Sequence, residues 1–295
     1  ASSQLGGVQG GDVAGQAEYL PTLAEDATTE EWFQNESVWN PDYPWNIGED
    51  WFIVDGYPTL EAPITWLDDP SYYDHELSGL GEQASPYLIT SNKELAGVAY
   101  LMLNYNDTYK NSYFRLTTNI DMSEYYWVPI GTTNALAFAG HFDGGNYTIT
   151  GLRAYAGWDG VGLFGTVIGT SASHAVIENV VMEDITISAN SYGGGVVGVG
   201  EYVEISNCRV IGTDNILKGT HLGGVIGYAM NSEVRDSYNN GTIEASGDYL
   251  GGVVGYANLS QVENCYATVS ASFTGITRGV VTNADSGNVG GLVGG

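Results

Sequence analysis

Short apolar segments flanked by glycine recur through the second half of this 295-residue chain. Five cassettes share the pattern glycine–apolar–apolar–glycine, at Gly162–Gly165, Gly195–Gly198, Gly224–Gly227, Gly252–Gly255 and Gly291–Gly294. Their starts lie 33, 29, 28 and 39 residues apart. A period of this size is typical of stacked repeats, in which each repeat buries its apolar face against its neighbours.

A second pattern follows the cassettes at a constant offset. Ile205-Ser206-Asn207-Cys208, Val234-Arg235-Asp236-Ser237 and Val262-Glu263-Asn264-Cys265 each begin ten residues after a cassette, and Ile177-Glu178-Asn179-Val180 is a looser copy at fifteen residues. Short strands at this period predict an all-β fold, a parallel β-helix or β-solenoid, with glycine at tight corners and close backbone approaches. The offset also aligns four side chains in an expected internal polar ladder, namely Asn179, Asn207, Asp236 and Asn264, with Asp236 interrupting the amides.

The remainder of the chain divides at residue 85. Residues 1–85 are acidic and irregular, with tryptophans as apolar anchors in a segment that caps the solenoid or ends an earlier cassette (Trp32, Trp39, Trp45, Trp51 and Trp66). Residues 86–155 are predicted to open the solenoid, and residues 156–295 to form the repeat array. The capping-box spacing of Ser91 and Glu94 predicts one short helix near residues 91–104. Residues 138–149 predict a strand, an Asp-Gly-Gly-Asn turn and a second strand.

The glycine cassette followed by Ile-x-Asn-Cys resembles the GLUG repeat of large bacterial surface and secreted proteins, including the non-catalytic part of some IgA-cleaving peptidases. The resemblance extends upstream through Phe114–Met122, Trp127–Gly131 and Phe142–Asn146, and more loosely to Val38–Leu60. It implies a right-handed parallel β-helix, surface display and, commonly, adhesion. It brings no catalytic motif onto this chain.

The charge balance is strongly acidic, with 35 Asp and Glu against 8 Lys and Arg and a net charge of -27. Seventeen of the acids lie from Asp12 to Glu82, before the first basic residue, Lys93. This excess repels phosphates and therefore argues against nucleic acid and anionic membranes as partners. No run of eighteen apolar residues occurs, so we expect no membrane insertion, and we expect an extracellular or cell-surface protein. The first residues lack a basic, apolar leader, which we expect to have been removed or to lie outside this sequence.

The two cysteines, Cys208 and Cys265, occupy the same offset in repeats that are two apart, and Ser237 holds that offset between them. Coils stacked about 4.8 Å apart would place their Cα atoms about 9.6 Å apart. A disulfide needs about 4.4–6.8 Å. We therefore expect no disulfide and two free, buried thiols.

The sequence gives weak signals for catalysis and metal binding. The histidines (His75, His141, His174 and His221) lack ligand spacing, and neither His-Glu-x-x-His nor Gly-x-Ser-x-Gly is present. Clustered oxygens at Asp143, Asn146 and Asp121 suggest a calcium site, although Asp-Gly-Gly-Asn is more often an ordinary turn. We expect no other cofactor. Five Asn-x-Ser/Thr sequons begin at Asn35, Asn106, Asn146, Asn240 and Asn258.

These features favour a non-catalytic extracellular module that serves structure or adhesion. The alternative is a carbohydrate-active β-helix enzyme, a glycoside hydrolase or lyase, with a carboxylate pair in a lateral groove. Because the last cassette lies at Gly291–Gly294 and Ser3–Gly7 resembles the segment after an earlier cassette, we expect end-to-end assembly, by self-association or as part of a longer fibre. Host or cell-surface glycans or proteins are the other expected partners.

Overall fold

The chain forms two compact units, residues 1–64 and residues 65–295. The computed structural model describes residues 52–54, 57–59, 64–155, 160–212, 215–218, 221–240, 243–245, 249–268, 271–273 and 281–282. In the first unit, β1 (Phe52–Val54) pairs antiparallel with β2 (Tyr57–Thr59). Residues 65–85 belong to the second unit, and the predicted division at residue 85 stays a prediction. Trp32, Trp39, Trp45 and Trp51 lie outside the described residues.

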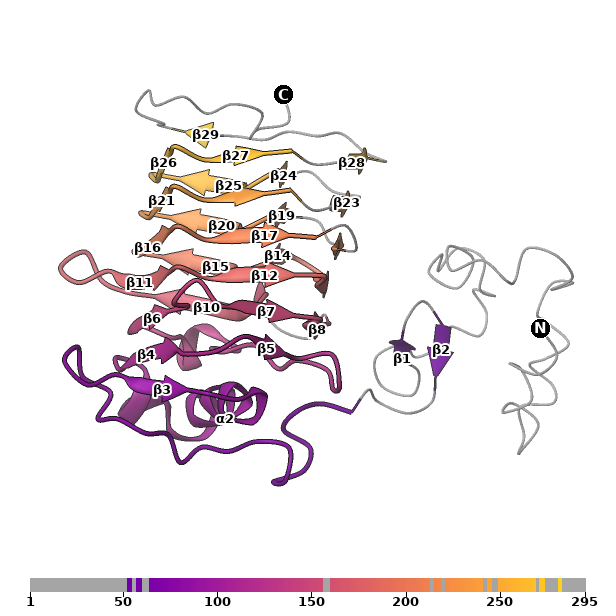
Figure 1. The fold of residues 1–295 in the computed structure, drawn as a ribbon. Helices are drawn as coiled ribbons and strands as arrows, with labels where there is room; N and C mark the ends of the chain where they lie inside the picture. Colours follow the sequence, from indigo (N-terminus) through magenta and orange to yellow (C-terminus); the bar gives the residue numbers. More distant parts are fainter. Residues whose placement is uncertain are drawn as a thin grey trace, which may run out of the picture. The chain divides into compact units, whose positions relative to one another are not determined.

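The second unit is a parallel β-helix in which short strands of successive coils pair side by side (Figure 1). The longest sheet contains β3 (Tyr87–Ile89), β4 (Tyr113–Leu116), β6 (His141–Asp143), β11 (Ala175–Glu178), β16 (Val203–Ser206), β21 (Glu233–Arg235) and β26 (Gln261–Glu263). The sheet that follows it contains β5 (Ile120–Asp121), β7 (Thr148–Thr150), β12 (Val181–Glu183), β17 (Arg209–Ile211), β22 (Tyr238–Asn239) and β27 (Tyr266–Ala267). Shorter sheets join β8 (Arg153–Ala154), β13 (Thr186–Ser188) and β18 (Ile216–Lys218), and β23 (Ile243–Ala245) with β28 (Ala271–Phe273).

Two further sheets lie on either side of the glycine cassettes. The strands before the cassettes are β9 (Gly160–Val161), β14 (Tyr192–Gly194), β19 (His221–Gly223) and β24 (Tyr249–Gly251). The strands that include the end of each cassette are β10 (Phe164–Ile168), β15 (Val197–Glu201), β20 (Ile226–Met230) and β25 (Val254–Asn258), with β29 (Val281–Thr282) pairing beyond them.

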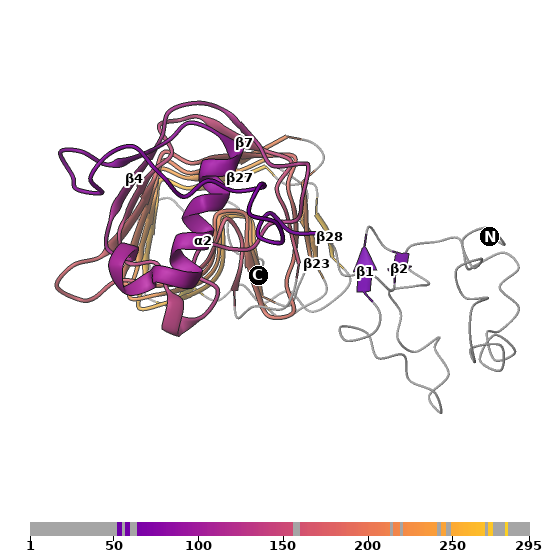
Figure 2. The ribbon, with the colours of Figure 1, turned by 90° about the horizontal axis from the view of Figure 1, so that it is seen from below.

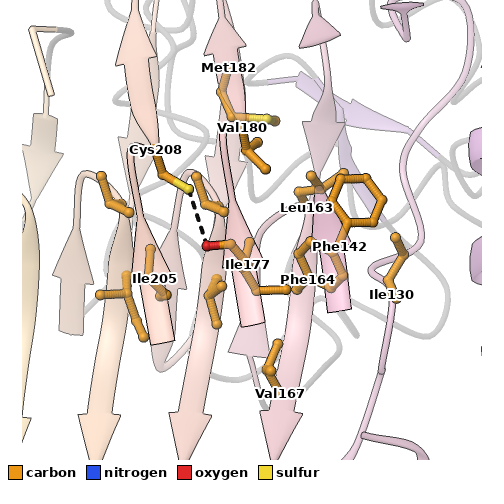
Figure 3. Packing of buried hydrophobic residues seen from close by; sticks show 14 of the residues in the cluster. Ile130, Phe142, Leu163, Phe164, Val167, Ile177, Val180, Met182, Ile205 and Cys208 are labelled. Atoms are coloured by element: carbon orange, nitrogen blue, oxygen red, sulfur yellow. Dashed lines mark hydrogen bonds between the residues drawn. The ribbon is translucent and has the colours of Figure 1, made fainter. Parts of the chain in front are cut away.

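Coil length is nearly constant from β11 to β26. Val176 pairs with Glu204, Glu204 with Glu233, and Glu233 with Gln261, so successive coils are 28, 29 and 28 residues long. Alternate side chains point inward, and the inward positions stack as a continuous apolar core. Figure 3 shows part of it, with Ile177 and Ile205 in neighbouring coils.

The cassettes hold the chain at sharp bends between two sheets that pack closely together. The first apolar residue of the four described cassettes is fully buried (Leu163, Val196, Val225 and Val253). A Cβ added at Gly195 would meet the side chains of Val210 and Ile185, so this bend reaches into the core. A Cβ at Gly194 would overlap the carbonyl oxygen of Val197, and one at Gly198 would overlap the backbone of β9. Glycine is therefore required because backbone lies against backbone here.

A helix covers the N-terminal end of the solenoid. Helix α2 (Asn92–Tyr109) lies across the coils when the molecule is viewed from that end (Figure 2). The predicted cap is confirmed, because Ser91 Oγ accepts a hydrogen bond from Glu94 N. The helix is longer than predicted, since the chain resumes helical hydrogen bonding after a non-helical residue at Tyr105. Leu95, Val98 and Met102 on its inner face are buried in the core.

Residues 65–85 form a strap over the same end. Asp74 N donates to the carbonyl oxygen of Lys93 on the helix. Leu88 N, on the free edge of β3, donates to Ser78 O of the strap. Trp66 is 1% exposed and belongs to the core. The β3 edge of the first coil is therefore bonded and covered rather than open.

We predict that Gly194→Ala destabilises the solenoid strongly. The added methyl group must displace the Val197 carbonyl, and overpacking of this kind costs about 1–3 kcal/mol, which corresponds to a fall in Tm of several °C. Thr186→Ala, on a half-exposed position of β13, is the matched control and should leave Tm nearly unchanged. Calorimetry of both variants tests this; equal Tm values would contradict the close-packed cassette.

Candidate functional site: the polar corner and the charged face

A column of residues with left-handed backbone forms one corner of the solenoid. Asn179, Asn207, Asp236 and Asn264 have φ between 50° and 57° and lie at the same position in successive coils. Each backbone N–H of the first three donates to a carbonyl of the next coil. Asn and Asp tolerate this backbone conformation better than other non-glycine residues, which accounts for the residue type.

The side chains of the lower part of this column are linked by hydrogen bonds. Asn179 Nδ2 donates to Asp143 Oδ1 over 2.8 Å, and Asn207 Nδ2 donates to Asn179 Oδ1 over 2.7 Å. Asp236 and Asn264 are exposed, and the structure shows no side-chain bond from either of them to the column. The predicted ladder is therefore present only at Asn179 and Asn207. It is also half-buried rather than internal, because the left-handed residue turns the chain at the surface.

An arginine lies at each end of this row of hydrogen-bonded side chains. Arg115 Nε and Nη2 donate to Asp143 Oδ2 over 2.8 and 2.6 Å. At the other end, Arg209 donates to Asn207 Oδ1 and to Asn146 Oδ1, and Asn146 also accepts from Asn207. We call these six residues (Arg115, Asp143, Asn146, Asn179, Asn207 and Arg209) the polar corner. It ties strands of several coils together along the solenoid axis.

Asp143 is the charged centre of the polar corner. Its side chain is only 10% exposed. Burial acts to raise its pKa, but hydrogen bonds from Asn179 and from Gly145 N, together with the Arg115 guanidinium, outweigh burial and bring the pKa below its usual value. Asp143 is therefore held as a carboxylate.

The residues proposed for calcium are arranged differently from the expectation. Asp143 and Asn146 share one turn, but their oxygens accept hydrogen bonds from Asn179, Asn207 and the two arginines. Asp121 lies on β5 in another sheet, and its Oδ1 accepts from Ser123 N. No group of three or more His, Cys, Asp or Glu side chains suited to a metal occurs in the described part of the chain. Calcium at this corner stays a prediction.

The thiols follow the corner column by one residue. Cys208 Sγ lies 3.4 Å from Ser206 O and 3.7 Å from Ile177 O (Figure 3), and Cys265 Sγ lies 3.2 Å from Glu263 O. Ser237, between them, makes the equivalent bond to Arg235 O. Both cysteines are free and buried. Burial raises the pKa of Cys208 to about 12 and that of Cys265 to about 11.

The outer face of the longest sheet carries paired charges. Glu204 and Glu233 lie in register on β16 and β21, and both approach Arg235, at 3.5 and 2.6 Å. His141 Nε2 lies 2.8 Å from Glu178 Oε1, one coil below Glu204. Glu178, Glu204 and Glu233 thus each lie next to a basic side chain.

Aromatic rings line the strands beside the cassettes. His221 stacks on Tyr249 at 4.6 Å, and Tyr228 stacks on Tyr256 at 5.2 Å with ring planes 9° apart. Tyr192 joins the two columns through contacts with His221 and Tyr228. The stacked rings cover one another's faces, which fixes coil register on the outside of the solenoid.

Comparison with known proteins identifies the repeats. The family model for the GLUG motif matches residues 218–244 and 246–272, each of which contains one cassette and the phrase that follows it. Halomucin from Haloquadratum walsbyi (strain DSM 16790 / HBSQ001) is 29% identical over 165 residues, which cover 53% of this chain. The chain spans only 2% of the length of halomucin.

One solved structure is similar to this chain at a low level. It is a Bacteroides ovatus protein described as an immunoglobulin A1 protease, with 18% identity and a TM-score of 0.37. The match covers 74% of this chain and 89% of the other. At this TM-score the likeness carries no argument. The predicted GLUG repeat is confirmed by the family model, and the predicted β-helix by the paired coils.

We predict that Asp143→Asn lowers stability at neutral pH by about 1 kcal/mol, because the amide keeps the acceptor for Gly145 and Asn179 but loses the ion pair with Arg115. Since folding lowers the Asp143 pKa, this contribution is present above the unfolded pKa of about 3.9 and is lost as pH falls through the folded value.

The difference in Tm between Asp143→Asn and the unmodified protein should therefore shrink below about pH 4. Asp107→Asn is the control, because Asp107 pairs with Lys110 but its side chain is 98% exposed. A pH-independent difference at Asp143 would show that the ion pair is not its cause.

We predict that neither thiol reacts with a disulfide reagent at pH 8 while the protein is folded. Burial and the raised pKa values leave almost no accessible thiolate. Both should react in denaturant, and Cys265→Ser should halve the total. Rapid labelling of the folded protein would contradict the described packing.

Proposed function

We propose that this GLUG-repeat chain is a structural module of an extracellular or cell-surface protein, built as a rigid stack of coils. The observation that carries the proposal is the uninterrupted coil-to-coil pairing of strands, reinforced by the polar corner. The GLUG motif and the partial likeness to halomucin support a place within a longer repetitive protein. No described helix is both long and apolar enough to cross a membrane.

The covered N-terminal end of the solenoid argues against one of the two expected modes of assembly. Self-association end to end would need the first coil to accept strands from another copy, but the strap and α2 occupy that end. We therefore propose that the solenoid is extended by further coils at its C-terminal end, within one longer polypeptide. Adhesion to glycans is a second role that the exposed sheet faces allow, but the stacked rings beside the cassettes offer edges rather than faces to a sugar.

The enzyme alternative rests on one feature. Glu204 and Glu233 are a carboxylate pair on neighbouring coils, which hydrolysis of a glycoside requires. Arg235 forms ion pairs with both carboxylates, and a carboxylate in an ion pair is less available to act as a nucleophile or general acid. We therefore propose a non-catalytic module.

The first test is location in the organism that makes the protein. Antibodies raised against residues 65–268 should label intact cells or the medium without permeabilisation. Labelling that appears only after lysis would contradict an extracellular module.

The second test addresses catalysis with the full chain. Incubation with neutral and acidic polysaccharides should release no new reducing ends, and the double variant Glu204→Gln/Glu233→Gln should behave identically. Activity in the unmodified protein that this variant loses would establish the enzyme instead.

A further inference from the structure

Three sequons that the structure describes in full differ sharply in their surroundings. Asn106 is 7% exposed, and its Nδ2 donates to the carbonyl oxygens of Leu136 and Ala137 over 2.9 and 3.2 Å. A sugar on that nitrogen would remove one of these bonds and would have to be buried. The sequon at Asn106 is therefore incompatible with the folded protein.

The sequon at Asn258 is built into the coil. Its hydroxyl residue, Ser260, is 1% exposed; its Oγ accepts from Ser232 N and donates to Asn258 O. Asn258 itself lies on β25 and shares a hydrogen bond with Tyr228. Neither the amide nor the hydroxyl is free for a transferase.

Asn146 is different in every respect. It lies in the exposed turn between β6 and β7, with φ of 61°, and the next residue, Tyr147, is also exposed. Its Oδ1 accepts from Asn207 and Arg209, so the side chain is held in one position. Its Nδ2 has no hydrogen-bond acceptor among the described residues, and Thr148 completes the sequon.

We propose that Asn146 is an acceptor for an N-linked oligosaccharide, an inference that rests on the extracellular location proposed above. The donor is a lipid-pyrophosphate-linked oligosaccharide. A bond forms between Asn146 Nδ2 and the anomeric carbon, the bond from that carbon to the pyrophosphate oxygen breaks, and Nδ2 loses one proton to the transferase. The amide keeps Oδ1, the atom that accepts the hydrogen bonds of the polar corner.

The full chain, secreted from a eukaryotic cell line that performs N-glycosylation, provides the test. After enzymatic release of glycans, which converts a glycosylated Asn to Asp, peptide mass spectrometry should find the conversion at Asn146 and not at Asn106 or Asn258. Thr148→Val, which removes only the hydroxyl, should lose the modification at Asn146, and Thr148→Ser should keep it.

An unmodified Asn146 in the secreted, folded protein would overturn the proposal, whether or not Asn35 or Asn240 is modified. Modification of folded protein at Asn106 or Asn258 to the same extent as Asn146 would also overturn it, because local geometry would then not select the site. Surface labelling of source cells together with an unmodified Asn146 would reject this inference alone and leave the structural module standing.

Discussion

The close approach of backbone to backbone at the cassettes is the constraint on which the solenoid depends. Gly194, directly before a cassette, and Gly198, at its end, lie where a side chain would overlap the backbone of a neighbouring strand, and this allows the apolar tips of the cassettes to reach the core. Without that contact, each coil would enclose a space that its short strands cannot fill. The recurrence of glycine in the sequence is therefore a packing requirement rather than a sign of flexibility.

The polar corner and the cassettes stabilise the stack in different ways. Cassettes bury apolar surface within and between coils, whereas the corner joins coils through directed hydrogen bonds that begin at Arg115 and end at Arg209. Asp143 accepts a hydrogen bond from Asn179, Asn179 accepts one from Asn207, and Asn207 accepts one from Arg209. The side-chain amides of Asn179 and Asn207 therefore donate in the same direction along the column. Such an alignment is expected to specify register, since a slip by one residue would break each bond in turn.

The sequence predicts the repeat well because the repeat is local. The cassette period and the constant offset of Asn207 and Asn264 follow from pattern alone, and so does the separation of Cys208 from Cys265. Arg115 and Arg209 could not be predicted as the ends of the polar corner, because each belongs to a different coil and to no shared motif. The same reason applies to the strap, whose bonds to Lys93 and Leu88 are made by a segment without periodicity. The sequence predicts calcium at Asp143 and Asn146 from an oxygen-rich turn, whose composition is the same whether it binds a cation or amide and guanidinium donors, and calcium there stays a prediction.

Hydrogen exchange across the full chain tests most directly whether backbone packing at the cassettes holds the solenoid together. Amides that pair neighbouring coils at the cassettes, such as those of Val196 and Val225, should be the most protected, and protection should recur with the coil period of 28 or 29 residues. Fast exchange at the cassettes, with protection confined to the outer sheets, would contradict the central role of backbone packing at glycine.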